Sequence, residues 1–316
     1  MAVHWRQRLT DLMEGMPSAD LDPTIDGAPA SRWRLWWSKA GGAILAAQLT
    51  PELRTAFRRV LNLNLALPGG RKRMCWATVT TKYASQTDLD NWNAASKRFS
   101  DDDLKKMRQL NVVYENGMLR NLSSRERLLC LGFPPDHFDG NPLSEEKRMA
   151  AVGQSFALLS AARVLLANLP HQARFGSPPV INVCSAFSGI GGAELVLAEF
   201  HRLGLIRLRY IISIELDHEL RAVVRRWFDK QPHLRDVELL ELGDISKVTN
   251  ERFADIVRRI GGIQLFIGGS PCNGFAGNNR HMHHDGGRVG TENWPSSHVF
   301  DYRRLIDVAR QVNAVL

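Results

Sequence analysis

The sequence of 316 residues predicts an α/β protein built on a doubly wound, mostly parallel sheet. Two observations support this fold class. Apolar strand-like runs alternate with amphipathic helix-like segments from residue 179 onward, and a glycine-rich turn follows the first of these runs. Because β-α-β units cross over with one hand, such strands become parallel neighbours in a single sheet. A hydrophobic fraction of 44% is enough for a core of this kind.

The elements expected in residues 179–316 follow one another closely. Strands are expected at 180–187, 210–215, 237–244 and 263–269, and helices at 193–204, 217–230, 250–261 and 298–311. Pro178 and Pro179 mark a linker before the first strand. The last helix has apolar residues at helical spacing, so we expect it to return and cover the sheet.

Residues 1–178 have a less regular pattern. A β-branched, alternating strand is expected at 74–81, directly after a cluster of three basic residues at 71–73. Residues 144–169 predict a loop followed by one apolar helix. The basic cluster is either a solvated surface or a phosphate-binding group.

Charge and composition narrow the class of partner. The net charge is +8, which favours a polyanion such as nucleic acid, although many basic proteins bind none. No uninterrupted apolar stretch approaches the roughly 18–20 residues that cross a bilayer, and the first 15 residues are charged where a signal peptide is apolar. We therefore expect a soluble intracellular protein. The four cysteines lie far apart and predict neither a zinc site nor a disulfide framework.

Three expected strand ends carry groups that suit a nucleotide. The turn at 187–192 is glycine-rich, although such a turn alone is shared by proteins that bind NAD, FAD or S-adenosylmethionine. Glu215 ends the second strand and suits the two ribose hydroxyls of an adenosine; Asp244 and Ile245 follow the third and suit the adenine edge. The alternatives are a solvated strand end for Glu215 and a helix N-cap for Asp244.

The fourth expected strand ends in Gly-Gly-Ser-Pro followed by Cys272. A cysteine on a loop at this end of a parallel strand faces the ligand cleft, and its reactive form is the thiolate. The alternative is a packed core cysteine. The glycine and proline context favours an exposed loop, so Cys272 is the candidate nucleophile.

Four segments together resemble the C5-cytosine DNA methyltransferases. FSGIGGAE at 187–194, IISIE at 211–215, GDISKV at 243–248 and FIGGSPCN at 266–273 have the order and spacing of that family. The sequence is most similar to the plant domains-rearranged, de novo methyltransferases. This resemblance implies the methyltransferase fold that binds S-adenosylmethionine, with a thiolate that adds to carbon 6 of a flipped-out cytosine.

Segments that normally follow the catalytic loop come first in this chain. Residues 127–134 and 153–156 resemble the last two family motifs, and 25–28 with 32–34 resemble the segment that carries an Arg-x-Arg pair. The resemblance therefore implies a circular permutation, which keeps a fold when the original termini lie close together. On this interpretation 1–178 contains the late motifs and a target-recognition region at about 40–125, 179–316 contains the cofactor and cysteine region, and both form one domain.

The resemblance also implies the site residues. The catalytic residues are Cys272, Arg32 and Arg34. The cofactor-binding residues are Phe187, Ser188, Gly189, Ile190, Gly191, Glu215, Leu216, Asp244, Ile245, Pro271, Ser155 and Phe156. The DNA-binding residues are Arg71, Lys72, Arg73, Thr81, Lys82, Asn273, Asn279 and Arg280. Further implications are double-stranded DNA as the partner, pairing of two like or related chains through the cofactor region, and action in the nucleus without a membrane.

One family feature is not found. The family uses a glutamate in an E-N-V-like motif to hold the target cytosine, and neither Glu14 nor Glu52 has that context. The first 17 residues resemble the helix that follows the motif, so the expected glutamate falls upstream of Met1. Two hypotheses follow: an active methyltransferase that extends upstream, or a catalytically impaired paralogue that binds DNA or stimulates an active partner. An RNA cytosine-5 methyltransferase is a third, disfavoured by the rearranged order.

Three histidines, His281, His283 and His284, share a loop rich in glycine and asparagine. A metal site is one interpretation, but a second group of ligands is missing from the sequence around them. We therefore expect no metal and favour a basic loop near DNA.

Overall fold

The computed structural model describes residues 18–21, 34–37, 49–57, 83–95, 99–169, 177–270, 283–284, 287–288 and 294–316. The chain divides into two compact units, one formed by Met1–Pro17 with Leu169–Leu316 and the other by Ser18–Asn168. Each unit is considered by itself below.

A four-stranded parallel sheet forms the centre of the first unit. Its strands are β5 (Val180–Ala186), β6 (Arg207–Ile214), β7 (Glu238–Leu242) and β8 (Leu265–Gly268), in the order β7-β6-β5-β8. The chain runs outward from β5 through β6 to β7 and then returns to place β8 on the other side of β5. The strand order therefore reverses between β5 and β8, which is the point where open α/β sheets bind ligands.

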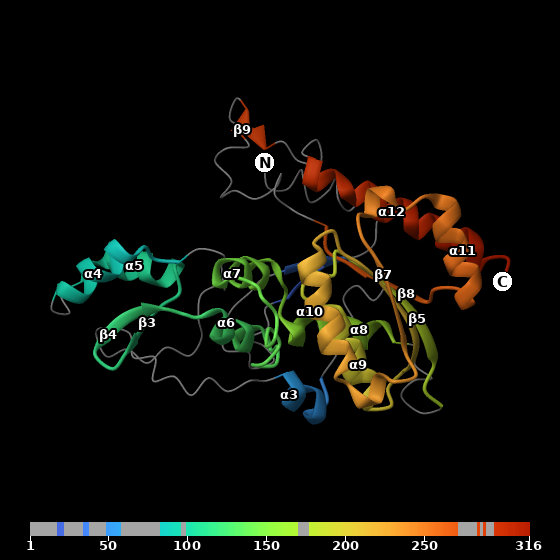
Figure 1. The fold of residues 1–316 in the computed structure, drawn as a ribbon, viewed down its shortest axis with the longest axis horizontal. Coiled ribbons are helices and arrows are strands. Elements are labelled where there is room, and N and C mark those ends of the chain that lie inside the picture. Colours follow the sequence, from blue (N-terminus) through green and yellow to red (C-terminus); the bar gives the residue numbers. More distant parts are fainter. Residues whose placement is uncertain are drawn as a thin grey trace. The chain divides into compact units, whose positions relative to one another are not determined.

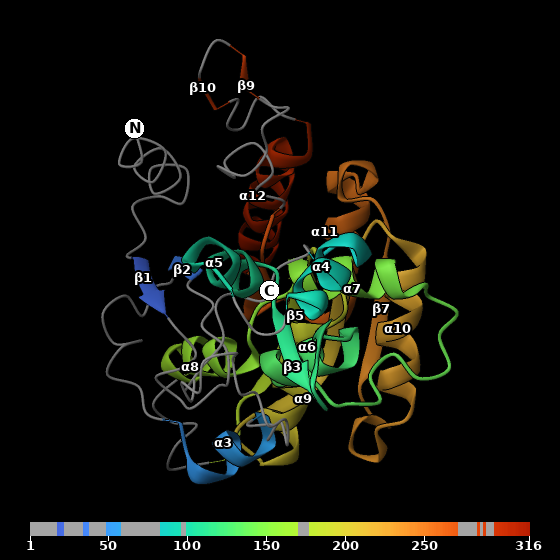
Figure 2. The same cartoon turned by 90° about the vertical axis from the view of Figure 1, so that its left-hand side faces the viewer.

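Helices cover both faces of this sheet, with α9 and α10 on one side and α11 and α12 on the other (Figures 1 and 2). Their bounds are α9 (Gly192–Arg202), α10 (His218–Asp229), α11 (Asn250–Ile260) and α12 (Trp294–Asn313), with short 3-10 turns η3 (Pro232–Leu234) and η4 (Ile245–Lys247). A two-residue ladder joins β9 (His283–His284) and β10 (Gly287–Arg288). The expected α/β class with a parallel sheet is confirmed.

Local sequence explains where these helices begin and end. Asp217 caps α10 by accepting the backbone N–H groups of Glu219 and Leu220, and Thr249 caps α11 by accepting that of Arg252. Gly261 ends α11 in the left-handed conformation that glycine adopts most readily. One face of α11 packs with α12 and the sheet in a buried core that includes Phe253, Val257 and Leu305. The predicted return of the last helix onto the sheet is thus confirmed.

The second unit contains short helices and hairpins. They are β1 (Ser18–Leu21), β2 (Arg34–Trp37), α3 (Pro51–Phe57), α4 (Gln86–Ala94), α5 (Asp101–Gln109), β3 (Val112–Glu115), β4 (Met118–Asn121), α6 (Ser124–Leu131), α7 (Glu145–Gln154) and α8 (Leu158–Asn168). The strand expected at 74–81 lies outside the described residues. Antiparallel ladders pair β1 with β2 and β3 with β4.

The prediction of a loop and one helix at 144–169 is wrong. Two helices occupy this stretch, because Ser144 accepts the backbone N–H of Lys147 at 3.2 Å and starts α7 at once. Ser155 ends α7 in an extended conformation before α8 begins. The acidic first turn of α7 is favourable at a helix N-terminus, so its polar sequence is a helix start rather than a loop.

A small hydrophobic cluster supports the β3–β4 hairpin. Leu89 and Trp92 of α4 and Met107 of α5 pack with Val112 and Leu119 from the two strands. Asn116 and Gly117 form the turn with positive φ angles of 51° and 87°, as a two-residue hairpin turn requires. Asn111, directly before β3, also has a positive φ angle, of 56°. This part of the chain has a core of its own.

One described segment, Glu145–Asn168, has the length and apolarity of a membrane-spanning helix. It consists of α7 and α8 with a break between them, and 72% of its most apolar window is buried inside the structure. Core helices pass the same test of length and composition. The segment is therefore weak evidence for a membrane span.

Candidate cofactor and catalytic site

The carboxyl ends of all four parallel strands meet at one edge of the sheet. Ala186 pairs with Ile214 on one side and with Gly268 on the other, and Ile214 pairs with Leu242. The segments that follow these residues are the glycine loop, Glu215, Asp244 and the start of the cysteine loop. The structure therefore brings together four segments that lie far apart in the sequence. Ser188 in the glycine loop and Gly268 at the start of the cysteine loop are 80 residues apart.

The glycine loop leaves β5 in a strained backbone conformation. Phe187 has φ 57°, which a side chain other than glycine rarely adopts, and its ring packs edge-to-face against Tyr302 at 6.2 Å. Gly191 has φ 80°, and a Cβ there would lie 3.0 Å from Val224 Cγ2. Gly189 also has a positive φ, but a Cβ there would meet no atom within 4 Å. The loop is packed from below at Gly191 and open at Gly189.

Glu215 lies at the open side of this loop. Its Oε2 accepts the backbone N–H of Gly189 at 2.8 Å, and its Oε1 accepts that of Asp217 at 2.9 Å. An ionised carboxylate has about four acceptor positions, so two backbone donors orient it and leave capacity for two hydroxyl groups. The adjacent Leu216 is 58% exposed, an apolar surface beside a polar group.

Asp244 follows β7 and caps the short turn η4. Its Oδ1 accepts both the backbone N–H and the hydroxyl of Ser246, at 3.0 and 2.7 Å. These hydrogen bonds are the main reason why the pKa of Asp244 lies below its ordinary value. The cap is thus present, as one of the two interpretations from sequence expects, and a carboxylate with one capping oxygen can also accept from a ligand.

Two predicted cofactor residues have buried side chains. Ile190 is 1% exposed and Ile245 is 4% exposed. Ile245 packs in the core with α11 and α12. A ligand at this edge therefore meets the backbone of these two residues rather than their side chains.

The segment that leads to the candidate nucleophile starts at the end of β8. A Cβ at Gly268 would lie 2.9 Å from Tyr302 Cε2. The ring of Tyr302, on α12, therefore leaves room only for glycine at position 268. Gly269 has open space around it. Cys272 itself lies outside the described residues, together with Pro271, Asn273, Asn279 and Arg280.

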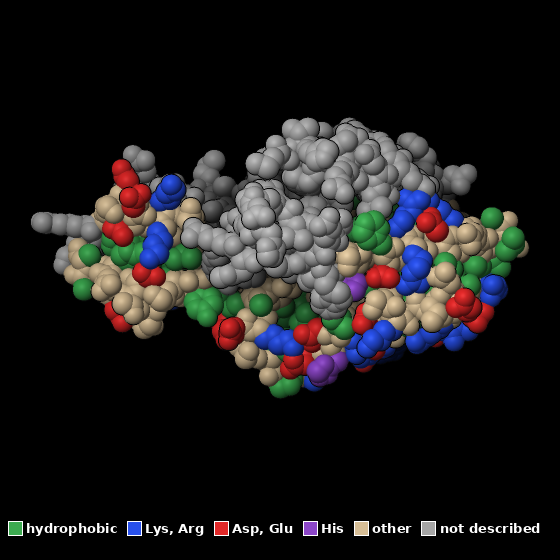
Figure 3. Space-filling model, turned by 90° about the horizontal axis from the view of Figure 1, so that it is seen from above, with side chains coloured by type: hydrophobic (Ala, Val, Ile, Leu, Met, Phe, Trp, Pro, Cys, Tyr) green, Lys and Arg blue, Asp and Glu red, His purple; other side chains and the backbone are tan. Residues whose placement is uncertain are grey.

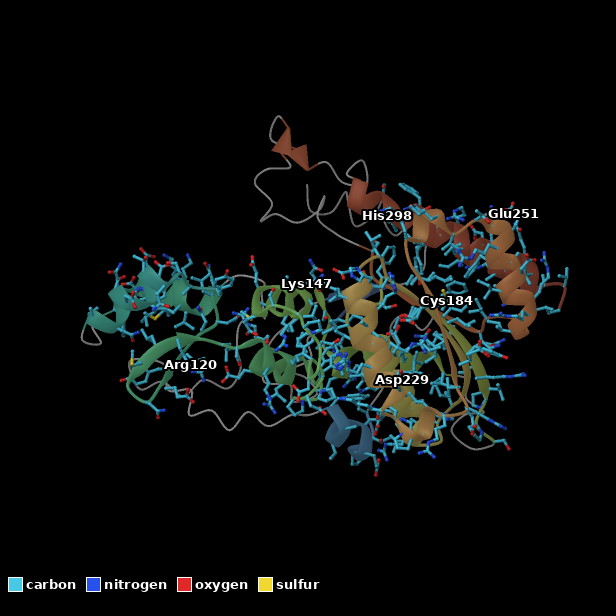
Figure 4. The ribbon with its side chains drawn as sticks, in the orientation of Figure 1. Arg120, Lys147, Cys184, Asp229, Glu251 and His298 are labelled. Atoms are coloured by element: carbon cyan, nitrogen blue, oxygen red, sulfur yellow. The ribbon has the colours of Figure 1, made fainter. Side chains whose placement is uncertain are left out.

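The described cysteines are poor nucleophiles. Cys130 and Cys184 are both free and buried, and Figure 4 shows Cys184 within the sheet region of its unit. Burial raises the pKa of Cys130 to about 12 and that of Cys184 further still. Since the thiolate is the reactive form, neither cysteine suits covalent catalysis.

Other predicted residues fall elsewhere or outside the described part of the chain. Ser155 and Phe156 belong to the second unit, where the Ser155 hydroxyl donates to the Ala151 carbonyl at 2.9 Å, so their cofactor role stays a prediction. Arg34 begins β2, but its side chain is not described. The predicted residues that lie outside the described ranges are Arg32, Arg71, Lys72, Arg73, Thr81 and Lys82.

Sequence reasoning missed several residues that shape this edge. Arg221 of α10 donates from Nη1 to the carbonyls of Glu215 and Leu216, at 2.6 and 3.0 Å. Arg304 of α12 donates to the carbonyls of Val248 and Ile245, at 2.8 and 3.3 Å, and so ties that helix to the turn after β7. Basic residues in amphipathic helices give no signal of such contacts, because most of them face solvent.

A third missed residue, Glu194, did leave a signal. It is an acidic residue in the otherwise apolar first turns of α9, directly after the glycine loop. An acid at this place is either a surface group at the helix N-terminus or a buried polar group with partners. Among the described residues there is no group of three potential metal ligands.

The sequence is similar to plant proteins that are named as DNA (cytosine-5)-methyltransferases. DNA (cytosine-5)-methyltransferase DRM2 from Oryza sativa subsp. japonica is 37% identical over 205 residues, 65% of this chain and 31% of the relative. The protein of that name from Arabidopsis thaliana is 36% identical over 183 residues, 57% of this chain and 26% of the relative. A protein named probable inactive DNA (cytosine-5)-methyltransferase DRM3, from Oryza sativa subsp. japonica, is 28% identical over 58% of this chain and 24% of its own length.

These alignments span less than a third of the curated relatives' own length. No family model matches the sequence. The resemblance drawn from the motifs of the sequence is confirmed by the named relatives, at 35–37% identity over 57–65% of the chain for the four most similar of those compared.

Proposed function

Because this chain is related to the domains-rearranged DNA (cytosine-5)-methyltransferases, we propose that it transfers a methyl group from S-adenosylmethionine to carbon 5 of cytosine in DNA. The observation that carries the proposal is the edge of the sheet where an open glycine, Gly189, donates its N–H to the carboxylate of Glu215. A loop that is open on one side and a carboxylate with acceptor capacity are what an adenosine group requires.

The residues at this edge fit the cofactor. The backbone of 187–191 would receive its amino-acid part, Glu215 its ribose hydroxyls, Asp244 and the Ile245 backbone its adenine edge, and Leu216 the face of the ring. The resemblance to the family supports Pro271, Ser155 and Phe156 as further cofactor-binding residues. When bound, S-adenosylmethionine supplies an electrophilic methyl group on a sulfonium.

Cys272 provides the nucleophile in this proposal. Its thiolate forms an Sγ–carbon 6 bond with the cytosine, which gives carbon 5 the electron pair with which it takes up the methyl group. Loss of the carbon 5 proton then restores the double bond and breaks the Sγ–carbon 6 bond. Arg32 and Arg34 complete the catalytic set, and all of these residues lie outside the described side chains.

DNA contact is proposed for residues outside the described part of the chain: Arg71, Lys72, Arg73, Thr81, Lys82, Asn273, Asn279 and Arg280. In Figure 3, positive and negative side chains are interspersed over the described part of the face shown. The net charge of +8 supports binding to a polyanion. A cytosine that reacts at carbon 6 must leave the base stack, so we propose that the target base is flipped out.

The resemblance to the family leads to three further proposals. The late motifs in 1–178 and the cofactor motifs in 179–316 belong to one permuted methyltransferase domain, with a target-recognition region at about 40–125. Two chains pair through the cofactor region. The protein acts in the nucleus, where a DNA methyltransferase meets its substrate.

A second function is a catalytically impaired paralogue that binds DNA or stimulates an active methyltransferase. The similarity to a relative named as probably inactive favours it. The first function is favoured by the higher identity to the relatives that are named as methyltransferases. The third, an RNA cytosine-5 methyltransferase, is disfavoured by the similarity to relatives that are named as DNA methyltransferases.

Trapping with 5-fluorocytosine separates these functions. Fluorine at carbon 5 cannot leave as a proton does, so an active enzyme with S-adenosylmethionine stays covalently bound to DNA that contains this base. We expect a cofactor-dependent adduct on a denaturing gel that Cys272→Ser abolishes. DNA with ordinary cytosine is the matched control. No adduct with DNA favours the impaired paralogue, and an adduct with 5-fluorocytosine RNA alone favours the RNA enzyme.

A further inference from the structure

A carboxyl group lies fully buried beneath the glycine loop. Glu194 is the third residue of α9 and is 0% exposed, although glutamate is rarely buried without a partner of opposite charge. The described residues form no ion pair with it. None of the residues proposed above for the cofactor, the nucleophile or DNA is Glu194.

Two serines connect Glu194 to the loop. Ser213 of β6 has its Oγ 3.1 Å from Glu194 Oε1 and 2.8 Å from the Oγ of Ser188. The Ser188 Oγ lies 3.0 Å from the carbonyl oxygen of Ser185, its shortest acceptor on the backbone. The three side chains therefore form a continuous chain of hydrogen bonds from the helix to the loop.

Ser188 also holds the loop through its backbone. Its N–H donates to the Ile214 carbonyl at 3.1 Å, and its carbonyl accepts the N–H of Gly191 at 2.8 Å. The next residue, Gly189, is the one that donates to Glu215. Any shift of Ser188 is therefore passed directly to the groups proposed to meet the cofactor.

Counting hydrogens shows which group must donate. A serine hydroxyl has one hydrogen. Ser213 Oγ lies in donor geometry to Ser188 Oγ at 2.8 Å and to Glu194 Oε1 at 3.1 Å, but it has one hydrogen, so one of these two contacts needs a hydrogen from its partner. When Ser188 donates to the Ser185 carbonyl at 3.0 Å and Ser213 donates to Ser188, the 3.1 Å contact between Ser213 Oγ and Glu194 Oε1 is a hydrogen bond if Glu194 carries the proton.

The surroundings of the second carboxyl oxygen agree with this count. Glu194 Oε2 is buried and has no hydrogen-bond partner. An ionised carboxylate would leave half of its charge unsolvated there, whereas a neutral acid needs only a weak acceptor site. Burial raises the pKa of Glu194 and outweighs the nearby backbone N–H and the hydroxyls of Ser185, Ser188 and Ser213, which lower it. The described titratable group that interacts with it is the Cys184 thiol, which is itself neutral.

We propose that Glu194 is a protonated positioning residue: its carboxyl donates to Ser213, Ser213 donates to Ser188, and this chain fixes the glycine loop in the shape that receives the cofactor. The protonation and the loop contact are properties of this unit alone. The consequence for cofactor affinity rests on the proposed function.

Infrared difference spectroscopy on the full chain tests the proton. The spectrum of the wild type minus that of Glu194→Gln at neutral pH should contain the carbonyl stretch of a protonated carboxylic acid. The matched control is Glu199→Gln, on the same helix, where the carboxylate pairs with Arg202 and the difference should contain a carboxylate band. A carboxylate band in the Glu194 difference would overturn the proposal.

Hydrogen exchange of the amides at 187–192 tests the link to the loop. Glu194→Leu fills a similar volume without a donor, so exchange should speed up about tenfold, the effect of one lost hydrogen bond, while Glu194→Gln and Glu199→Gln stay within about twofold. Ser213→Ala should match Glu194→Leu, which keeps the test decisive if the leucine variant does not fold. Unchanged exchange in both would refute the positioning role.

Calorimetric titration with S-adenosylhomocysteine separates this proposal from the proposed function. Affinity should fall about tenfold in Glu194→Leu and Ser213→Ala and be kept in Glu194→Gln, because glutamine can still donate to Ser213. If the wild type binds no S-adenosylhomocysteine, the proposed function fails, and the infrared and exchange results still decide the role of Glu194.

Discussion

Polar side chains are held in different ways at the strand-end edge of the first unit and around the β3–β4 hairpin of the second. At the edge, Glu215 accepts two backbone N–H groups and keeps acceptor capacity for something else. Around the hairpin, charged side chains satisfy one another. Arg120 pairs with Glu115 and Glu126 at 2.7 and 2.8 Å, and Lys106 pairs with Asp88 at 2.7 Å.

The two regions differ in whether a charged side chain is bound by backbone N–H groups or by a side chain of opposite charge. A side chain that pairs with another side chain has used its charge to connect two elements, and Figure 4 shows Arg120 on such a hairpin. A carboxylate oriented by the backbone is fixed in place without being neutralised, which is how a preorganised binding group is made. Charge alone therefore does not mark a functional site. Substitutions of charged residues around the hairpin should change stability and leave cofactor affinity unchanged, and substitution of Glu215 at the edge should lower cofactor affinity with little change in stability.

The largest effect on stability is expected at Arg127 of α6. It is 0% exposed, donates to the Leu122 carbonyl at 3.3 Å, and has its pKa lowered by burial to about 10, so it stays charged at neutral pH. Arg127→Ala should lower the free energy of unfolding by about 4 kcal/mol, because buried acceptors lose a charged donor. Urea unfolding, monitored by hydrogen exchange of the amides at 99–168, measures this change in the free energy of unfolding.

Arg127→Met is the partner variant for that measurement. It restores most of the volume without the charge, and the difference between the two variants gives the share due to packing. A loss below about 1 kcal/mol in Arg127→Ala would show that the guanidinium is dispensable. The affinity for S-adenosylhomocysteine should be unchanged in the variant that remains folded.

Gly191 and Gly189 provide a matched pair at the edge. Both have positive φ angles, 80° and 54°, but an added Cβ meets Val224 at 3.0 Å only at Gly191. Gly191→Ala should cost about 2 kcal/mol of stability, and Gly189→Ala about 1 kcal/mol from backbone strain alone. Thermal unfolding of both variants measures this order.

The two glycine variants should have the opposite order in cofactor affinity: Gly189→Ala should weaken binding more than Gly191→Ala. The Cβ of Gly189→Ala enters the open space above the loop, so this variant should bind S-adenosylhomocysteine at least about tenfold more weakly than the wild type. Its loss of stability should nevertheless be the smaller of the two. Equal binding by the wild type and Gly189→Ala would place the ligand elsewhere.

Glu215→Gln tests the edge without a steric change. The carboxylate accepts two backbone N–H groups, and an amide has one oxygen for the pair, so the side chain loses its fixed orientation. We expect an affinity for S-adenosylhomocysteine about tenfold lower, or about 1.4 kcal/mol, with little change in the melting temperature. Glu251→Gln, exposed at the start of α11, is the control (Figure 4). An equal loss in both would remove the special role of Glu215.

The parallel sheet was predictable because its strands are buried on both faces. Such strands appear as apolar runs, and the expected ranges 180–187 and 237–244 agree within two residues with β5 (Val180–Ala186) and β7 (Glu238–Leu242). The residues at their carboxyl ends could be placed together from topology alone. Glu215 was found in this way, since it directly follows β6.

Contacts between side chains far apart in the sequence could not be predicted. The pairing of Ser213 with Glu194, and of Arg304 with the turn after β7, depends on how α9 and α12 pack against the sheet. The hairpin at Asn116 and Gly117 is different, because an Asn-Gly pair between two β-branched or apolar runs is itself a strong local signal for a hairpin turn. Propensity also failed at Ser144, where a polar stretch is a capped helix start.

The smallest effect belongs to Glu126, which joins a helix cap to an ion pair. Its carboxylate accepts the N–H of Ser123 at 2.8 Å, while Ser123 accepts the N–H of Glu126, and Arg120 donates to both carboxylate oxygens. Burial raises the pKa of Glu126, but the bonds from Arg120 and Ser123 together lower it below its ordinary 4.5. A lowered acid pKa adds stability above the unfolded value, and that stability is lost as the pH falls through the folded value.

Glu126→Gln should therefore cost about 1 kcal/mol at pH 7 and progressively less below the ordinary pKa of 4.5. Urea unfolding of the wild type and the variant, at neutral pH and at a series of values below 4.5, measures the closing gap. Glu146→Gln, exposed in the first turn of α7, should show no such convergence because its carboxylate has no arginine partner of this kind among the described contacts. A gap that persists in acid would mean that the cap acts through the geometry of the side chain rather than through its charge.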